Sequence, residues 1–123
     1  EPTRRCPGDL YSRLIELSTG YPYADAYVSS FLGGQPPVVK NFAARNVVRH
    51  TVTGSYAGVL QSLAIKTNVA ITEWIPLATV GEKLDPSPKG RVAVAFFEAK
   101  DLAERDALVH NLLSGQVFRI SYA

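Results

Sequence analysis

The sequence contains no methionine and a single cysteine among its 123 residues. One cysteine excludes an internal disulfide and any metal site built from several cysteines, and it favours a reducing cytoplasm as the location. Because even the initiator methionine is missing, we expect that a segment upstream of Glu1 has been removed. No apolar run approaches the roughly 20 residues that span a bilayer, so we do not expect a membrane partner.

Charge of either sign is also scarce. Charged residues make up 20% of the chain and the net charge is +2. Residues 1–50 carry six Lys/Arg against four Asp/Glu, whereas residues 51–123 carry seven of each. Proteins that bind nucleic acid usually show a denser basic patch with interleaved aromatic residues, so we do not expect a nucleic-acid partner. The length and the 46% hydrophobic content are those of one soluble globular domain.

Two helices are predicted in the first third of the chain. Asp9 is a plausible N-cap for a helix of about ten residues that ends before Gly20. Pro22 suits the first turn of a second helix, which Gly33 and Gly34 would terminate.

The remainder of the chain is predicted to alternate between strands and turns, with one further helix. The strongest strand is 91–99, which is apolar enough to be buried on both faces. Asp101 is expected to cap a helix over 102–113, which Gly115 ends. The other predicted strands are 46–52, 59–65, 70–77 and 117–122, and 85–90 is the clearest loop.

This order of elements, joined by short connections, predicts an α+β fold with a mostly antiparallel sheet flanked by helices. We expect residues 1–123 to form a single domain. Residues 1–34 would hold the N-terminal segment and the two helices, and residues 35–123 would hold the sheet and the C-terminal helix.

The N-terminal segment has the most specific pattern of chemistry. Glu1 supplies a carboxylate, Arg5 a guanidinium that can grip an anion with two hydrogen bonds, and a Pro-Gly-Asp turn follows at 7–9. The segment resembles the late motif of ATP-grasp ligases, Glu-x-Asn-x-Arg with a glycine soon after it. In carboxylate–amine ligases of this superfamily the motif continues into Pro-Gly-Asp and a helix. Thr3 stands where the motif carries asparagine, and a hydroxyl is a weaker metal ligand than an amide oxygen.

The resemblance implies that the chain is the C-terminal portion of such a ligase, with the lid and sheet region that follows the motif. The parent would use ATP and Mg²⁺ to join a small carboxylate to an amine through an acyl phosphate. Glu1 and, in second place, Thr3 would hold the magnesium ion, and Arg5 would act on the acyl phosphate. The isolated chain is expected to bind neither cofactor, because the N-terminal and central lobes that complete the nucleotide cleft would be its missing partners.

Two further residues are candidates for substrate binding. Gly8 permits a close backbone approach to an anion, and the helix that follows offers its positive N-terminal end. Arg49 shares strand parity with Arg45, and two arginines on one face would suit an anionic substrate. In both cases a purely structural role is the alternative. The turn at Gly8 would then only cap the following helix, and the two arginines would only be solvent-exposed residues of a strand.

The aromatic residues Tyr23, Tyr27 and Phe31 are spaced four apart and share one face of the second predicted helix. Such a stripe either packs in a core or forms a surface for another chain. The second interpretation supports an alternative function, in which the chain is a non-catalytic α+β protein-interaction module. It also predicts that the isolated chain self-associates.

Overall fold

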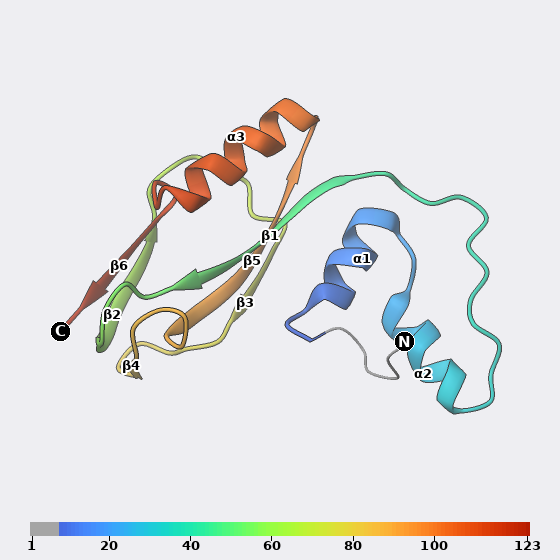
Figure 1. The fold of residues 1–123 in the computed structure, drawn as a ribbon, viewed down its shortest axis with the longest axis horizontal. Helices are drawn as coiled ribbons and strands as arrows, with labels where there is room; N and C mark the ends of the chain where they lie inside the picture. Colours follow the sequence, from blue (N-terminus) through green and yellow to red (C-terminus); the bar gives the residue numbers. More distant parts are fainter. Residues whose placement is uncertain (1–7) are drawn as a thin grey trace. The chain divides into compact units, whose positions relative to one another are not determined.

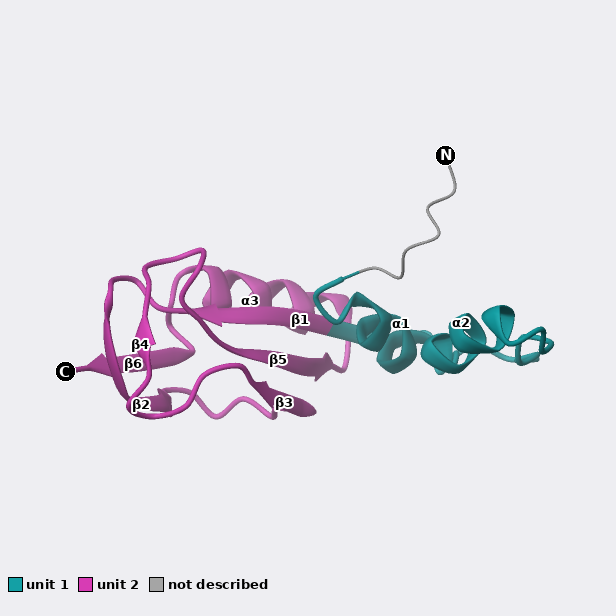
Figure 2. Ribbon diagram, turned by 90° about the horizontal axis from the view of Figure 1, so that it is seen from below, with its two compact units in different colours: residues 1–47 teal, residues 48–123 magenta. Residues whose placement is uncertain are grey.

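A computed structural model describes residues 8–123 (Figure 1). The fold is α+β, with three helices and antiparallel strand pairs in the described range, as predicted. The chain divides into two compact units, one up to Val47 and one from Val48 to Ala123 (Figure 2). The expected single domain, with its parts divided after residue 34, stays a prediction. None of the helices in the described range has the length and apolar character needed to span a bilayer.

Unit 1 contains the two predicted helices, α1 (Tyr11–Thr19) and α2 (Tyr23–Phe31). Gly20 follows α1 in the left-handed conformation (φ 73°), and its N–H donates to the Glu16 carbonyl at 2.8 Å. Gly33 follows α2 with φ 72°. Glycine adopts this conformation without the steric cost that a Cβ imposes, so both predicted helix ends are confirmed.

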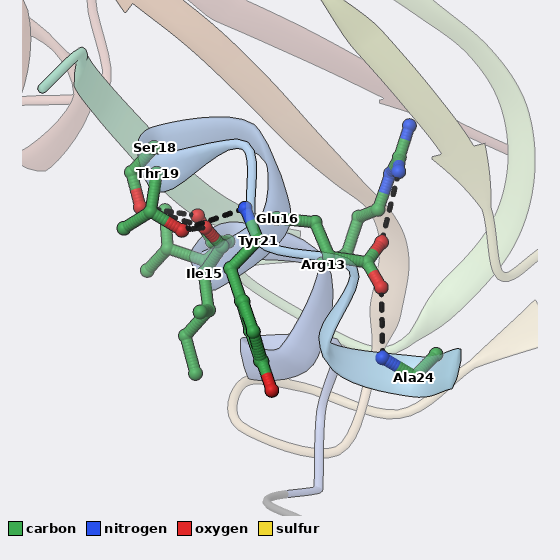
Figure 3. A network of polar contacts seen from close by, with 8 residues as sticks. Arg13, Ile15, Glu16, Ser18, Thr19, Tyr21 and Ala24 are labelled. Carbon is green, nitrogen blue, oxygen red and sulfur yellow. Dashed lines mark hydrogen bonds and ion pairs between the residues drawn. The ribbon is translucent and has the colours of Figure 1, made fainter. Parts of the chain in front are cut away.

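A carboxylate from α1 joins the two helices. Glu16 Oε2 accepts a hydrogen bond from Arg13 Nη1 at 3.0 Å, and Oε1 accepts one from the backbone N–H of Ala24 at 3.0 Å (Figure 3). Ala24 lies in the first turn of α2, whose N-cap residue, Pro22, makes no side-chain capping hydrogen bond. Glu16, a residue of α1, therefore caps the N-terminus of α2 in place of a side chain at the N-cap.

The segment that follows α2 returns to the end of α1. The N–H of Ala43 donates to the Thr19 carbonyl at 2.8 Å, and the N–H of Arg45 donates to the Ser18 carbonyl at 3.0 Å. The rings of Tyr21 and Phe42 lie 6.0 Å apart. These contacts fix residues 42–45 against the helical pair.

Unit 2 is built on two three-stranded sheets, with strand orders β1-β5-β3 and β4-β2-β6. The pairs β3–β5, β2–β4 and β2–β6 are antiparallel. The strands are β1 (Asn46–Thr53), β2 (Gly58–Ile65), β3 (Glu73–Pro76), β4 (Lys83–Leu84), β5 (Arg91–Ala99) and β6 (Phe118–Tyr122). The strand predicted over 70–77 is shorter than expected, and β4 was not predicted.

The central strand β5 is the core of unit 2. Six consecutive residues, 92–97, are each at most 3% exposed, so both faces of the strand are buried as predicted. Ala95 and Phe97 pack with Leu108 and Leu112 of the helix α3 (Leu102–Leu113) and with Val117. Figure 2 shows α3 lying along the sheet that contains β1 and β5.

The N-terminus of α3 has the predicted cap. The carboxylate of Asp101 accepts a hydrogen bond from the Glu104 N–H at 2.8 Å, and the Glu104 carboxylate accepts one from the Lys100 N–H at 2.7 Å. This reciprocal arrangement is a variant of the capping box, in which the N3 carboxylate accepts from the residue before the N-cap rather than from the N-cap itself. Gly115, with φ 69°, follows the end of the helix as predicted.

Candidate functional site

The turn at Gly8 leads into α1 by an unexpected backbone path. The Gly8 carbonyl accepts a hydrogen bond from the Tyr11 N–H at 3.4 Å, and both Asp9 and Leu10 have left-handed backbones, with φ of 63° and 62°. Because of these two residues the helix begins one position later than expected. Its N-cap is Leu10, whose side chain has no oxygen that could accept a hydrogen bond from the helix. The prediction that Asp9 caps this helix is therefore wrong.

Gly8 itself lies on the surface, as an anion-binding glycine must. The N-cap residue of α1 makes no side-chain hydrogen bond to the helix. Both facts are compatible with the expected approach of an anion to this turn, and the role of Gly8 as a substrate-binding residue stays a prediction.

Arg49 lies on β1 and is half-buried. It stands next to His50, which is also half-buried and whose ring is stacked on that of Phe118 at 6.1 Å with 9° between the planes. Burial, followed by the positive charge of Arg49, lowers the pKa of His50. The neutral form of the imidazole is therefore favoured at His50, beside the guanidinium of Arg49. Arg45 lies one residue before the strand and belongs to unit 1, so the two arginines do not share a strand.

Three of the predicted site residues, Glu1, Thr3 and Arg5, lie outside the range that the structure describes. Their roles stay predictions. Between residues 8 and 123 there is no group of three or more His, Cys, Asp or Glu side chains that could hold a metal ion.

The acidic residues around the start of α3 have a structural role. Asp101 and Glu104 form the capping box, and the Asp106 carboxylate accepts two hydrogen bonds from Arg105, at 2.9 and 2.8 Å. Acidic groups are favoured at a helix N-terminus by the helix dipole alone. This geometry explains the cluster without a ligand.

The aromatic face of α2 is only partly covered. The rings of Tyr27 and Phe31 lie 5.0 Å apart, and Tyr23 and Tyr27 are half-buried, whereas Phe31 is 65% exposed. Two neighbours, Val28 and Leu32, are 52% and 80% exposed. We refer to Val28, Phe31 and Leu32 as the α2 patch.

Sequence reasoning missed a cavity in unit 2. It measures about 620 Å³, lies between β2 and β3 and includes Trp74, the single tryptophan of the chain. Its lining is otherwise mostly aliphatic. Strands were predicted over 59–65 and 70–77, but no local pattern shows that residues from two different sheets line one cavity.

Comparison with known proteins supports the fold. No family model and no curated protein sequence matches the chain. Among solved structures, phosphoribosylglycinamide synthetase from Anaerococcus prevotii superposes with a TM-score of 0.66 and 12% identity over 93% of this chain. The match spans 30% of that protein, so the chain corresponds to less than a third of its length. The chain thus shares the fold of the matched part of this synthetase.

Proposed function

We propose that the chain is the C-terminal part of an ATP-dependent ligase that joins a carboxylate to an amine. The observation that carries the proposal is the structural match, which takes in 93% of this chain but only 30% of a phosphoribosylglycinamide synthetase. The motif at Glu1–Arg5 and the Pro-Gly-Asp turn after it supply an independent argument from sequence. The fold and the motif thus support the same proposal.

In this proposal ATP and Mg²⁺ would supply the activation of the carboxylate as an acyl phosphate, which the amine then attacks. The contribution of the present chain is electrostatic. Arg5 would stabilise negative charge near the reacting group, and the turn at Gly8 would present backbone N–H groups to an anion. Arg49 would contact the anionic substrate from β1. Glu1 and Thr3 would be the metal ligands of this segment, with the remaining ligands in lobes that the chain does not contain.

The proposal predicts that the 123-residue chain does not bind MgATP tightly, because most of the nucleotide cleft lies elsewhere. Isothermal titration of the chain with MgATP is expected to show no binding stronger than about 1 mM. The longer protein that contains this chain is expected to bind MgATP in the same assay. A micromolar constant for the 123-residue chain alone would mean that the site is complete within it and would contradict the fragment proposal.

A second candidate function rests on the α2 patch. Three adjacent apolar side chains of one helix end are more than half exposed, which is typical of a surface that another chain covers. On this reading the chain is a non-catalytic interaction module. The two functions differ in their dependence on Arg5, which the ligase requires and a binding module does not.

A further inference from the structure

The cavity between β2 and β3 has the size and lining of a small-molecule site. Its volume of about 620 Å³ falls within the range of ligand pockets, roughly 300–1,000 Å³. Leu60 and Val92 are each 3% exposed and belong to the core beneath the cavity. Ile65 and Val80 also line it and are 50% and 72% exposed. The cavity thus has buried walls and an exposed apolar rim. We call it the Trp74 groove.

The rim of the Trp74 groove is held in place by backbone hydrogen bonds. In the turn that carries Val80, the Gly81 N–H donates a hydrogen bond to the Leu60 carbonyl at 2.8 Å. The Leu60 N–H donates to the Glu82 carbonyl of the same turn at 2.9 Å. Within the turn the Glu82 carboxylate accepts a hydrogen bond from the Thr79 N–H at 3.0 Å. The groove is therefore formed before any ligand arrives, which lowers the entropic cost of binding.

The polar groups of the groove indicate the chemistry of the ligand. Glu73 is the only ionisable residue in the lining, and it already takes part in an interaction of its own. Trp74 is half-buried and brings an indole ring with one N–H donor to the lining. Thr72 adds a hydroxyl to the lining. An aliphatic groove with a ring face, one N–H donor and one hydroxyl suits an uncharged, largely apolar molecule with a hydrogen-bond acceptor.

The neighbouring sheet edge argues against an extended peptide as the occupant. β3 is an edge strand of its sheet, but it has only four residues and ends at Pro76, which has no N–H. Short edge strands and proline are features that prevent the addition of another strand. β3 would offer a polypeptide few backbone groups to pair with, whereas a small molecule needs only the groove.

We propose that the Trp74 groove binds an uncharged, largely apolar small molecule, independently of any nucleotide chemistry elsewhere in the protein. Nile red, an uncharged and apolar dye, is a suitable probe. Titration of the 123-residue chain is expected to give a dissociation constant on the order of 10 μM. Trp74 emission should fall in parallel with the rise in dye emission, and the bound dye should protect Trp74 from quenching by acrylamide.

Two exposed rim residues provide the decisive variant. The double substitution Ile65→Lys with Val80→Lys places charge at the mouth and is expected to weaken dye binding by at least about tenfold. Phe31→Lys is the matched control, since it replaces an apolar residue of similar exposure (65%) in the α2 patch and is expected to leave the constant unchanged. Circular dichroism checks that each variant is folded.

Several results would overturn the proposal. One is that the dye does not bind the unmodified chain, and another is that it binds without protecting Trp74. A third is that Phe31→Lys abolishes binding while the double rim variant retains it, which would place the dye on the α2 patch. If the double variant fails to fold, the acrylamide measurement on the unmodified chain decides alone. Concentration-dependent sedimentation of the dye complex, with no protection of Trp74, would favour a protein partner.

Discussion

At the scale of single residues, His50 is the clearest case in which the environment sets the chemistry. Its half-buried ring stacks on Phe118 and adjoins the guanidinium of Arg49. Both burial and the neighbouring charge disfavour the protonated imidazole, so the pKa of His50 is lower in the folded protein than in the unfolded chain.

This difference in pKa predicts a dependence of stability on pH. As the pH falls, the unfolded chain takes up the proton first. The contribution of His50 to the free energy of unfolding is therefore fully present above the ordinary histidine pKa of about 6.5. It is lost as the pH falls from there through the lowered pKa of the folded state. Urea unfolding between pH 7.5 and 5 is expected to show this loss in the unmodified chain and a smaller one in His50→Gln. His110→Gln, at an exposed helix position, is the control; an equal effect of the two substitutions would contradict the assignment.

Phe97 tests the packing of the core of unit 2. It is fully buried and packs in one cluster with Leu108, Leu112 and Val117. Phe97→Ala is expected to lower the free energy of unfolding by about 3–5 kcal/mol, because it removes transfer free energy and leaves a cavity. Phe42→Ala, at a side chain that is 62% exposed, should cost much less. Comparable losses in guanidinium titrations of the two variants would show that Phe97 is not a core residue.

Two aspartates show how far single residues can be predicted. Asp9 and Asp101 both precede an apolar run at a position typical of an N-cap, and only Asp101 caps its helix. Asp101 has the extended backbone of an N-cap, with φ −149°, whereas Asp9 has φ 63° and is followed by a second left-handed residue. Both residues have a side chain that is suited to an N-cap, and the difference between them lies in the backbone. The backbone of a non-glycine residue with positive φ leaves no comparable mark in the sequence.

At the scale of secondary-structure elements, predictability followed the strength of the local pattern. β5 and α3 begin and end where the sequence indicated, because one is a continuous apolar run and the other has a capping aspartate and a terminal glycine. β4 has two residues and is defined only by its pairing with β2, so it has no pattern of its own. The Trp74 groove was missed for the same reason, since it depends on the placement of two sheets.

The contact of Glu16 with α2 gives a prediction at this scale. Its hydrogen bond from the Ala24 N–H, together with Arg13, lowers the pKa of the Glu16 carboxyl despite the opposing effect of partial burial. Glu16→Ala, which removes the accepting oxygens, is expected to destabilise the helical pair by about 0.5–1 kcal/mol, in the range of a lost N-cap or a lost charge near a helix N-terminus. Faster amide hydrogen exchange at Ala24 would report this loss directly.

Arg13→Gln is the matched control for the Glu16 variant, because it removes the ion pair and keeps the cap on Ala24. It should affect exchange at Ala24 less than Glu16→Ala does. Since the carboxyl pKa is lowered in the folded state, the contribution of Glu16 is present above the ordinary glutamate pKa of about 4.3. It is lost as the pH falls through the lowered value. Exchange at Ala24 that is equally fast in all three proteins would contradict the capping role.

At the scale of the whole molecule, the α2 patch predicts association. Val28, Phe31 and Leu32 are exposed at the end of one helix, and burial of apolar side chains of this size is worth about 1.5–3 kcal/mol each. Sedimentation of the isolated chain is expected to show concentration-dependent self-association, which Phe31→Ser should weaken. Leu113→Ser, at a residue of unit 2 that is 79% exposed, is the control. A monomer at all concentrations up to the high micromolar range would contradict this prediction.

The central claim, that this chain completes the site of an ATP-dependent ligase, is tested most directly at Arg5. In the parent ligase that we propose, carboxylate- and amine-dependent release of phosphate from ATP should fall by about 100-fold or more in Arg5→Ala, with little change in thermal stability. Arg4→Ala, at the variable position beside it, should retain near-normal turnover. Equal turnover of the two variants and the unmodified protein, or the absence of phosphate release that depends on a carboxylate and an amine, would contradict the account.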